Sequence, residues 1–126
     1  SSQFMQSIIS LLYIGLGGFL GAISRWGLGN TIKKIYNEGN FPFSTLIINL
    51  LGCFGIGLAY AIWENNNNAK LLLIIGFLGG FTTFSTFAHE VLLLIKNGNS
   101  LYAIFYVILS SALGVLLVSL GMKLSS

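Results

Sequence analysis

Four long apolar stretches, separated by short polar segments, make up almost all of the chain. The stretches cover about residues 7–27, 43–63, 71–95 and 101–122. Each is long enough to cross a hydrocarbon core of about 30 Å as a helix. The polar connections cover residues 29–42, 64–70 and 96–100. The pattern therefore predicts an all-α membrane protein, a single domain over residues 1–126 with four transmembrane helices.

The connections contain residues that end one helix and begin the next. Pro42 stands directly before the second stretch, where the start of a helix tolerates proline. Asn97-Gly98-Asn99 is typical of a turn. Within the first connection we expect a short interfacial helix over residues 31–36. Aromatic side chains near the ends of the stretches are typical of an aromatic belt. They are Trp26, Tyr36, Phe41, Trp63 and Tyr102.

Composition supports the membrane interpretation and excludes several function classes. Hydrophobic residues make up 55% of the chain and charged residues 7%, whereas a soluble domain carries about 25% charged residues. The net charge of +3 is small and scattered, so the chain has no basic stripe for nucleic acid. We find no hydrolase triad, phosphate loop or metal-ligand cluster, and expect no enzyme. Cys53 lies in an apolar run and is expected to be a small buried side chain.

The charged residues specify the orientation of the chain only weakly. Four spans place both termini on the same side as the second connection. That side carries Lys70 and Lys123, and the opposite side carries Arg25, Lys33, Lys34 and Lys96. This difference is a small bias under the positive-inside rule, so the chain is compatible with insertion in both orientations. If both orientations pair, the product is an antiparallel two-fold dimer. The small interior of a four-span bundle also favours a dimer.

Small residues recur at helical spacing in the first two stretches. They are Gly17, Gly18, Gly21 and Ala22 in the first, and Gly52, Gly55, Gly57 and Ala59 in the second. In lipid, such residues let two helix backbones approach closely. We interpret them as packing positions.

The third stretch differs, because its centre poorly supports a continuous helix. Two adjacent glycines are followed by two threonines, which predicts a break near Gly79–Thr83. A break at membrane depth frees backbone carbonyls, which must be satisfied by protein, an ion or water. Carbonyl oxygens suit a hard cation such as sodium. The alternative is an ordinary helix with a kink.

A few polar side chains lie inside the predicted spans. Asn49 is surrounded by apolar neighbours, and a buried amide must find partners. It either caps a neighbouring helix break or presents its NH2 group to a passing anion. Thr45 lies one turn earlier on the same face. Tyr106 and Ser110 likewise share a face of the fourth span. Their hydroxyls either bond to backbone carbonyls or line a path.

Aromatic and charged residues of the third span, and one arginine, leave similar alternatives. Phe84 and Phe87 are three residues apart and share a face. Their rings either pack, or present electropositive edges to a small anion. Arg25 is expected to anchor the interface, to form a salt bridge with a carboxylate, or to draw anions towards a vestibule. His89 and Glu90, near the end of the span, are interpreted as partly hydrated and structural.

Three motifs together resemble the Fluc (CrcB) fluoride channels. They are GGFLGAISRW at residues 17–26, FSTLIINLLG at 43–52 and GFLGGFTTFSTF at 76–87. The resemblance covers nearly the whole chain. It implies an antiparallel, dual-topology homodimer with two pores and a structural sodium at its centre. It also implies passive export of fluoride from the cytoplasm across the cell (inner) membrane, with membrane lipid and a second copy as the partners.

The resemblance also assigns roles to single residues. Asn49 resembles the pore asparagine of the family, with Thr45 one turn before it. Phe84 and Phe87 resemble its two pore rings. The polar track of the fourth span corresponds to Tyr106 and Ser110. The sodium ligands correspond to the backbone carbonyls of Gly79 and Thr82. The chain departs from the family pattern at Gly114, where some members carry a serine, and at Trp26, where a tyrosine is more usual.

Two other function classes remain open at this point. A small proton-coupled multidrug transporter also has four spans and dual topology, but it needs a carboxylate embedded in the membrane. Here spans one, two and four carry none, and Glu90 is expected near an end. A non-conducting structural subunit would explain the glycines but not the combination of the break with Asn49, Phe84 and Phe87.

Overall fold

The computed structural model describes residues 2–36 and 39–125, and these residues form helices and no strands. Four helical spans, over residues 3–35, 43–62, 67–96 and 100–124, are long and apolar enough to cross a membrane. The prediction of an all-helical, multi-pass membrane protein is confirmed, and the span limits agree to within a few residues except in the first span. The elements are α1 (Gln3–Ile35), α2 (Phe43–Ile62), α3 (Asn67–Ala69), η1 (Lys70–Leu78), α4 (Gly79–Phe81), α5 (Phe84–Lys96) and α6 (Ser100–Leu124).

The first span is longer than expected, because α1 continues without interruption to Ile35. The separate interfacial helix expected over residues 31–36 was therefore wrong. Ile32 is buried in a cluster with Ile48 and Phe81, which holds the last turns of α1 against α2 and the third span. Lys33 and Lys34 lie in the last turn, where cations interact favourably with the helix dipole.

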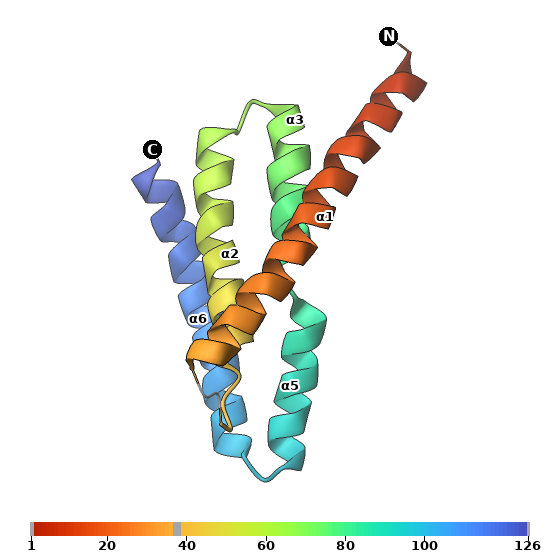
Figure 1. Cartoon of the computed structure of the whole chain (residues 1–126). Helices are drawn as coiled ribbons and strands as arrows, with labels where there is room; N and C mark the ends of the chain where they lie inside the picture. Colours follow the sequence, from red (N-terminus) through yellow and green to blue (C-terminus); the bar gives the residue numbers. More distant parts are fainter. Residues whose placement is uncertain (1, 37–38, 126) are drawn as a thin grey trace.

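Both termini lie at the same end of the bundle as the connection between α2 and α3 (Figure 1). The turn between α5 and α6 lies at the opposite end, so the expected arrangement of the connections is confirmed. The outer faces of α1 and α6 expose large apolar side chains, including Leu12 and Val115. Such surfaces suit contact with lipid or with another apolar chain.

Glycines let α1 cross the third span at close range. A methyl group added at Gly17 would collide with the carbonyl oxygen of Leu72, and one at Gly21 with that of Phe77. The packing role predicted for these two residues is confirmed. Between α2 and α6, Gly57 and Gly121 allow the same close approach.

The third span is broken, as predicted. It begins with α3 and the π-helix η1, continues through the single turn α4, and resumes as α5. Thr82 (ψ 156°) and Thr83 (φ −146°, ψ 116°) are extended between α4 and α5. The adjacent glycines are themselves helical, and the break falls at the threonines that follow. Threonine suits this place, because its branched side chain favours extended backbone and its hydroxyl caps a helix.

Candidate functional site

The side chain of Asn49 holds the broken span to α2. Its Nδ2 donates to the carbonyl of Thr83 (3.0 Å), and the backbone N–H of Thr83 donates to its Oδ1 (2.8 Å). The capping interpretation of Asn49 is therefore correct. The amide carries two hydrogens, so one is left after the bond to Thr83. A contact between this second hydrogen and an anion stays a prediction.

Arg25 fastens α1 to the segment just before the break. Its Nε donates to the carbonyl of Gly80 (3.1 Å). Arg25 also lines a pocket of about 140 Å³ together with Lys33, Ser44 and the hydroxyl side chains of the neighbouring threonines. Arg25 thus has a structural role through a backbone carbonyl, and it also lies in a positively charged pocket beside the break.

Two carbonyls at the break lose the donor that a continuous helix would offer them. A helical carbonyl accepts from the N–H four residues later. For Gly79 that donor is Thr83, whose N–H bonds to Asn49. For Thr82 it is Thr86, whose N–H bonds to the Thr83 hydroxyl (3.3 Å). The carbonyls that lose these donors belong to Gly79 and Thr82, the two residues predicted to bind sodium. Carbonyl oxygens are suitable sodium ligands.

Four of the six predicted pore residues meet around one cavity of about 430 Å³ beside the break. They are Asn49, Phe84, Phe87 and Ser110. The two rings lie 5.8 Å apart and tilted by 42°, and 78% of Phe84 is exposed. The hydroxyl oxygen of Ser110 is buried with no hydrogen-bond partner within the part of the chain that the structure describes.

Cys53 also lines this cavity. It is partly buried, rather than the enclosed apolar side chain that the sequence predicted. The cavity that it lines is bounded by α2, by the break with the start of α5, and by α6.

The other two predicted pore residues converge on Glu90. The Tyr106 hydroxyl donates to Glu90 Oε1 (2.9 Å), and the Thr45 hydroxyl donates to Oε2 (3.1 Å). Tyr106 is fully buried, and its ring meets that of Phe87 edge-on at 4.9 Å. This cluster of Thr45, Glu90 and Tyr106 therefore adjoins the cavity through Phe87.

Sequence reasoning assigned Glu90 only a partly hydrated, structural role. A signal was present, because Glu90 lies three residues after Phe87 on α5, so the two side chains share a face. Its partners come from α2 and α6, however, and their convergence depends on tertiary packing. His89, on a neighbouring face, is exposed.

A family model described as "CrcB-like protein, Camphor Resistance (CrcB)" matches residues 12–122. The chain belongs to the CrcB-like family. Three similar proteins are each named as a fluoride-specific ion channel. The protein from Phocaeicola vulgatus is 48% identical to this chain, and the match covers 92% of this chain and 98% of the relative. The protein from Dehalococcoides mccartyi is 42% identical over 92% of each chain, and that from Clostridium perfringens is 40% identical over 96% of this chain and 97% of the relative. The family resemblance inferred from the three motifs is confirmed. In this CrcB-like chain, the second and third motifs meet where Asn49 bonds to Thr83.

Proposed function

We propose that this chain conducts fluoride passively across the cell membrane and acts as a channel rather than an enzyme. The observation that carries the proposal is the cavity beside the break, where Asn49, Phe84, Phe87 and Ser110 gather in a family whose relatives are named for fluoride. The inside-negative potential of a cell favours outward movement of anions, at about 2.3 kcal/mol per charge per 100 mV. No further energy source is needed for export.

The chemistry of the cavity suits a small, strongly hydrated anion. Ser110 offers a buried hydroxyl, Asn49 a second amide hydrogen, and Phe84 and Phe87 the positive edges of their rings. Neither lysine nor arginine lines this cavity over residues 2–36 and 39–125. A set of weak donors without a fixed cation permits binding that is strong enough for entry and weak enough for release.

The pocket of Arg25 and Lys33 forms the proposed vestibule. Thr83 lines both this pocket and the cavity, so the two adjoin at the break. A pocket lined by cations raises the local concentration of anions. Thr45 and Tyr106 are the proposed secondary donors. Each hydroxyl has one hydrogen, which here bonds to Glu90, so it would serve fluoride only by leaving that carboxylate.

The channel is proposed to be an antiparallel, dual-topology homodimer with two pores. A ring that is 78% exposed, as Phe84 is, cannot enclose an ion on its own chain, so a second copy would complete the wall. The near balance of charge between the two ends is compatible with both orientations in one membrane. At the centre, the carbonyls of Gly79 and Thr82 from both chains would hold a structural sodium. The diverted helical donors at these residues support this assignment.

A proton-coupled multidrug transporter is the alternative, with Glu90 as its embedded carboxylate. Both oxygens of Glu90 accept hydroxyl hydrogen bonds. Family membership and the relatives' names favour the fluoride channel.

Fluoride release from liposomes tests the proposal. Purified protein is reconstituted into liposomes loaded with potassium fluoride and diluted into fluoride-free buffer, and valinomycin is added to let potassium follow. A fluoride electrode should record rapid release only when both protein and valinomycin are present. Release no faster than from protein-free liposomes would refute the channel. Uptake of a cationic dye driven by a pH gradient, without fluoride release, would support the transporter instead.

A further inference from the structure

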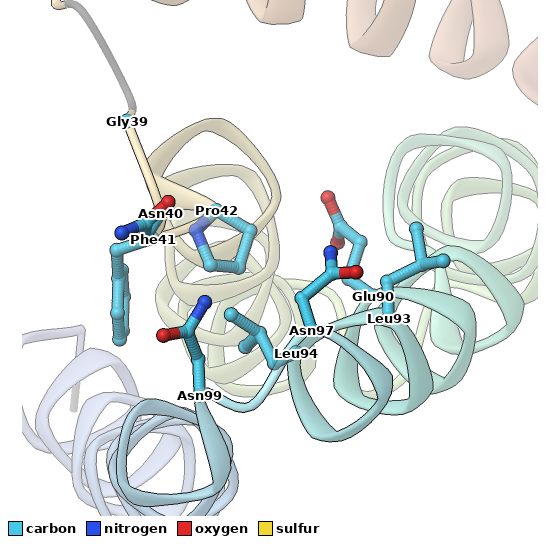
Figure 2. Close-up of a pocket in the computed structure, with 9 residues that line it drawn as sticks. All are labelled: Gly39, Asn40, Phe41, Pro42, Glu90, Leu93, Leu94, Asn97 and Asn99. Atoms are coloured by element: carbon cyan, nitrogen blue, oxygen red, sulfur yellow. The ribbon is translucent and has the colours of Figure 1, made fainter.

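A further pocket opens next to Glu90, at the end of the bundle that carries the turn between α5 and α6. This loop pocket has a volume of about 190 Å³ and is lined by residues 39–42, Glu90, Leu93, Leu94, Asn97 and Asn99. Figure 2 shows the side chains of Asn99 and Asn40 near Pro42, and that of Asn97 beside Glu90. The loop pocket shares no lining residue with the cavity beside the break.

The cluster around Glu90 separates the loop pocket from that cavity. On the cavity side, the ring of Phe87 contacts the ring of Tyr106. On the pocket side, Phe41 lies against the same tyrosine, with ring centroids 5.5 Å apart. The Tyr106 hydroxyl and the Glu90 carboxylate, joined at 2.9 Å, form the polar part of this partition. If the fluoride path continues towards this end, an ion would pass them to reach the loop pocket.

We propose that the loop pocket is the mouth of the fluoride path at this end, and that Asn97 and Asn99 are the ion contacts in it. The inference rests on the proposed fluoride conduction and adds a second place, beside the pocket of Arg25 and Lys33, where the path would meet water at this end. Each asparagine amide supplies two N–H donors to an anion that is losing or regaining its hydration shell.

The charge at the mouth suits release rather than capture. The residues that line the loop pocket over the described ranges include Glu90 but no lysine or arginine. An anion held by amides beside a carboxylate is bound weakly, and conduction requires that the ion leaves readily. The pocket of Arg25 and Lys33 lies at the same end of the bundle and has the opposite character, so it would gather anions beside the mouth rather than form the far end of the path. The two pockets meet at the bond between Thr45 and Glu90, since each of these residues lines one of them.

Charge substitution provides the first test. Asn97→Asp and Asn99→Asp add a negative charge at the proposed mouth, and Asn65→Asp adds the same charge in the exposed connection between α2 and α3, at the other end of the bundle. Fluoride release should fall by about threefold or more in the first two variants, and the loss should shrink at high salt because salt screens exposed charges. Asn65→Asp should release fluoride at the wild-type rate.

A second variant keeps the test decisive if an aspartate prevents assembly. Asn99→Cys is compared with the wild type, whose Cys53 sets the background reactivity, before and after an anionic thiol-specific reagent. The reagent should slow release through Asn99→Cys more than through the wild type, because Cys53 lines the cavity and can react in both proteins. If the wild type conducts fluoride but neither the aspartate variants nor modified Asn99→Cys differ from their controls, the mouth lies elsewhere. If the wild type itself conducts no fluoride, the proposed function fails first.

Discussion

At the scale of single residues, one amide connects the fold to the proposed pathway. Asn49 pairs with both the N–H and the carbonyl of Thr83, and it also lines the cavity. The sequence predicted each role as an alternative, and the capping role is confirmed. It could not predict that Thr45 and Tyr106 donate to Glu90, because these three residues come from different helices and only packing brings them together.

Asn49→Asp should abolish fluoride release and weaken the fold. The aspartate keeps the acceptor for the Thr83 N–H, but it removes the donor to the Thr83 carbonyl and places a negative charge beside the path. Loss of one buried partner costs about 1–3 kcal/mol. Efflux and thermal melting of the same preparation separate the two effects. A folded variant with wild-type flux would exclude Asn49 as an ion contact.

Phe84→Ile should slow fluoride release several-fold while leaving stability almost unchanged, because the ring is mostly exposed. The variant keeps apolar bulk and removes the positive ring edge, and about 1 kcal/mol lost at a barrier slows passage about fivefold. Phe87→Ile should slow release too, with a larger loss of stability, since Phe87 packs against Tyr106.

Phe4→Ile is the matched control for the two ring variants, because Phe4 is 72% exposed near the start of α1. It should conduct like the wild type. Wild-type efflux rates in both Phe84→Ile and Phe87→Ile would mean that the rings only pack.

At the scale of elements, the third span is where the sequence predicted the most about the structure. The glycine and threonine pattern predicted the break, although the helix continues through both glycines and opens only at Thr82 and Thr83. The exact place depends on Asn49 of α2, which binds Thr83 and stabilises it outside the helix. The length of α1 was missed for a similar reason, because Ile32 is held by contacts with other spans.

Close packing of α1 on the third span should make Gly21→Ala destabilising. The added methyl group would meet the Phe77 carbonyl, which belongs to the backbone and cannot rotate away. Overpacking of this kind costs about 1–3 kcal/mol. Gly15→Ala in the same helix is the control, since no atom lies within 4 Å of its added methyl, and alanine favours helix over glycine. In detergent, Gly21→Ala should melt several degrees lower and Gly15→Ala no lower than the wild type. Equal melting temperatures would contradict this packing.

At the scale of the whole molecule, the proposed channel depends on a second copy. The four spans and the shared end of the two termini followed from the sequence, because hydropathy and an even number of helices determine them. The shape of the cavity around Phe84 could not be predicted from the sequence. A cavity that opens at the surface of one chain acquires its final shape only in an assembly. The dimer and its central sodium accordingly stay proposals supported by exposure, charge balance and the freed carbonyls of the break.

Sodium removal should weaken the proposed dimer. Because backbone carbonyls supply the ligands, Thr82→Ser should retain sodium dependence, and its hydroxyl can still donate to the Leu78 carbonyl as threonine does (2.9 Å). Replacing sodium by a large organic cation should lower the dimer fraction and the fluoride flux in both proteins. A dimer fraction and a fluoride flux that are the same with and without sodium would count against the central ion.

The central claim, passive conduction of fluoride, is tested most directly by the potential at which fluoride flow reverses. Liposomes hold tenfold more fluoride inside than outside, and potassium gradients with valinomycin set the membrane potential. Net flow should vanish when the inside is about 59 mV positive, which balances a tenfold gradient of a monovalent anion, with outflow below that potential and inflow above it. Fluoride flow that does not change with the membrane potential, or whose direction is reversed by a pH gradient, would contradict passive conduction.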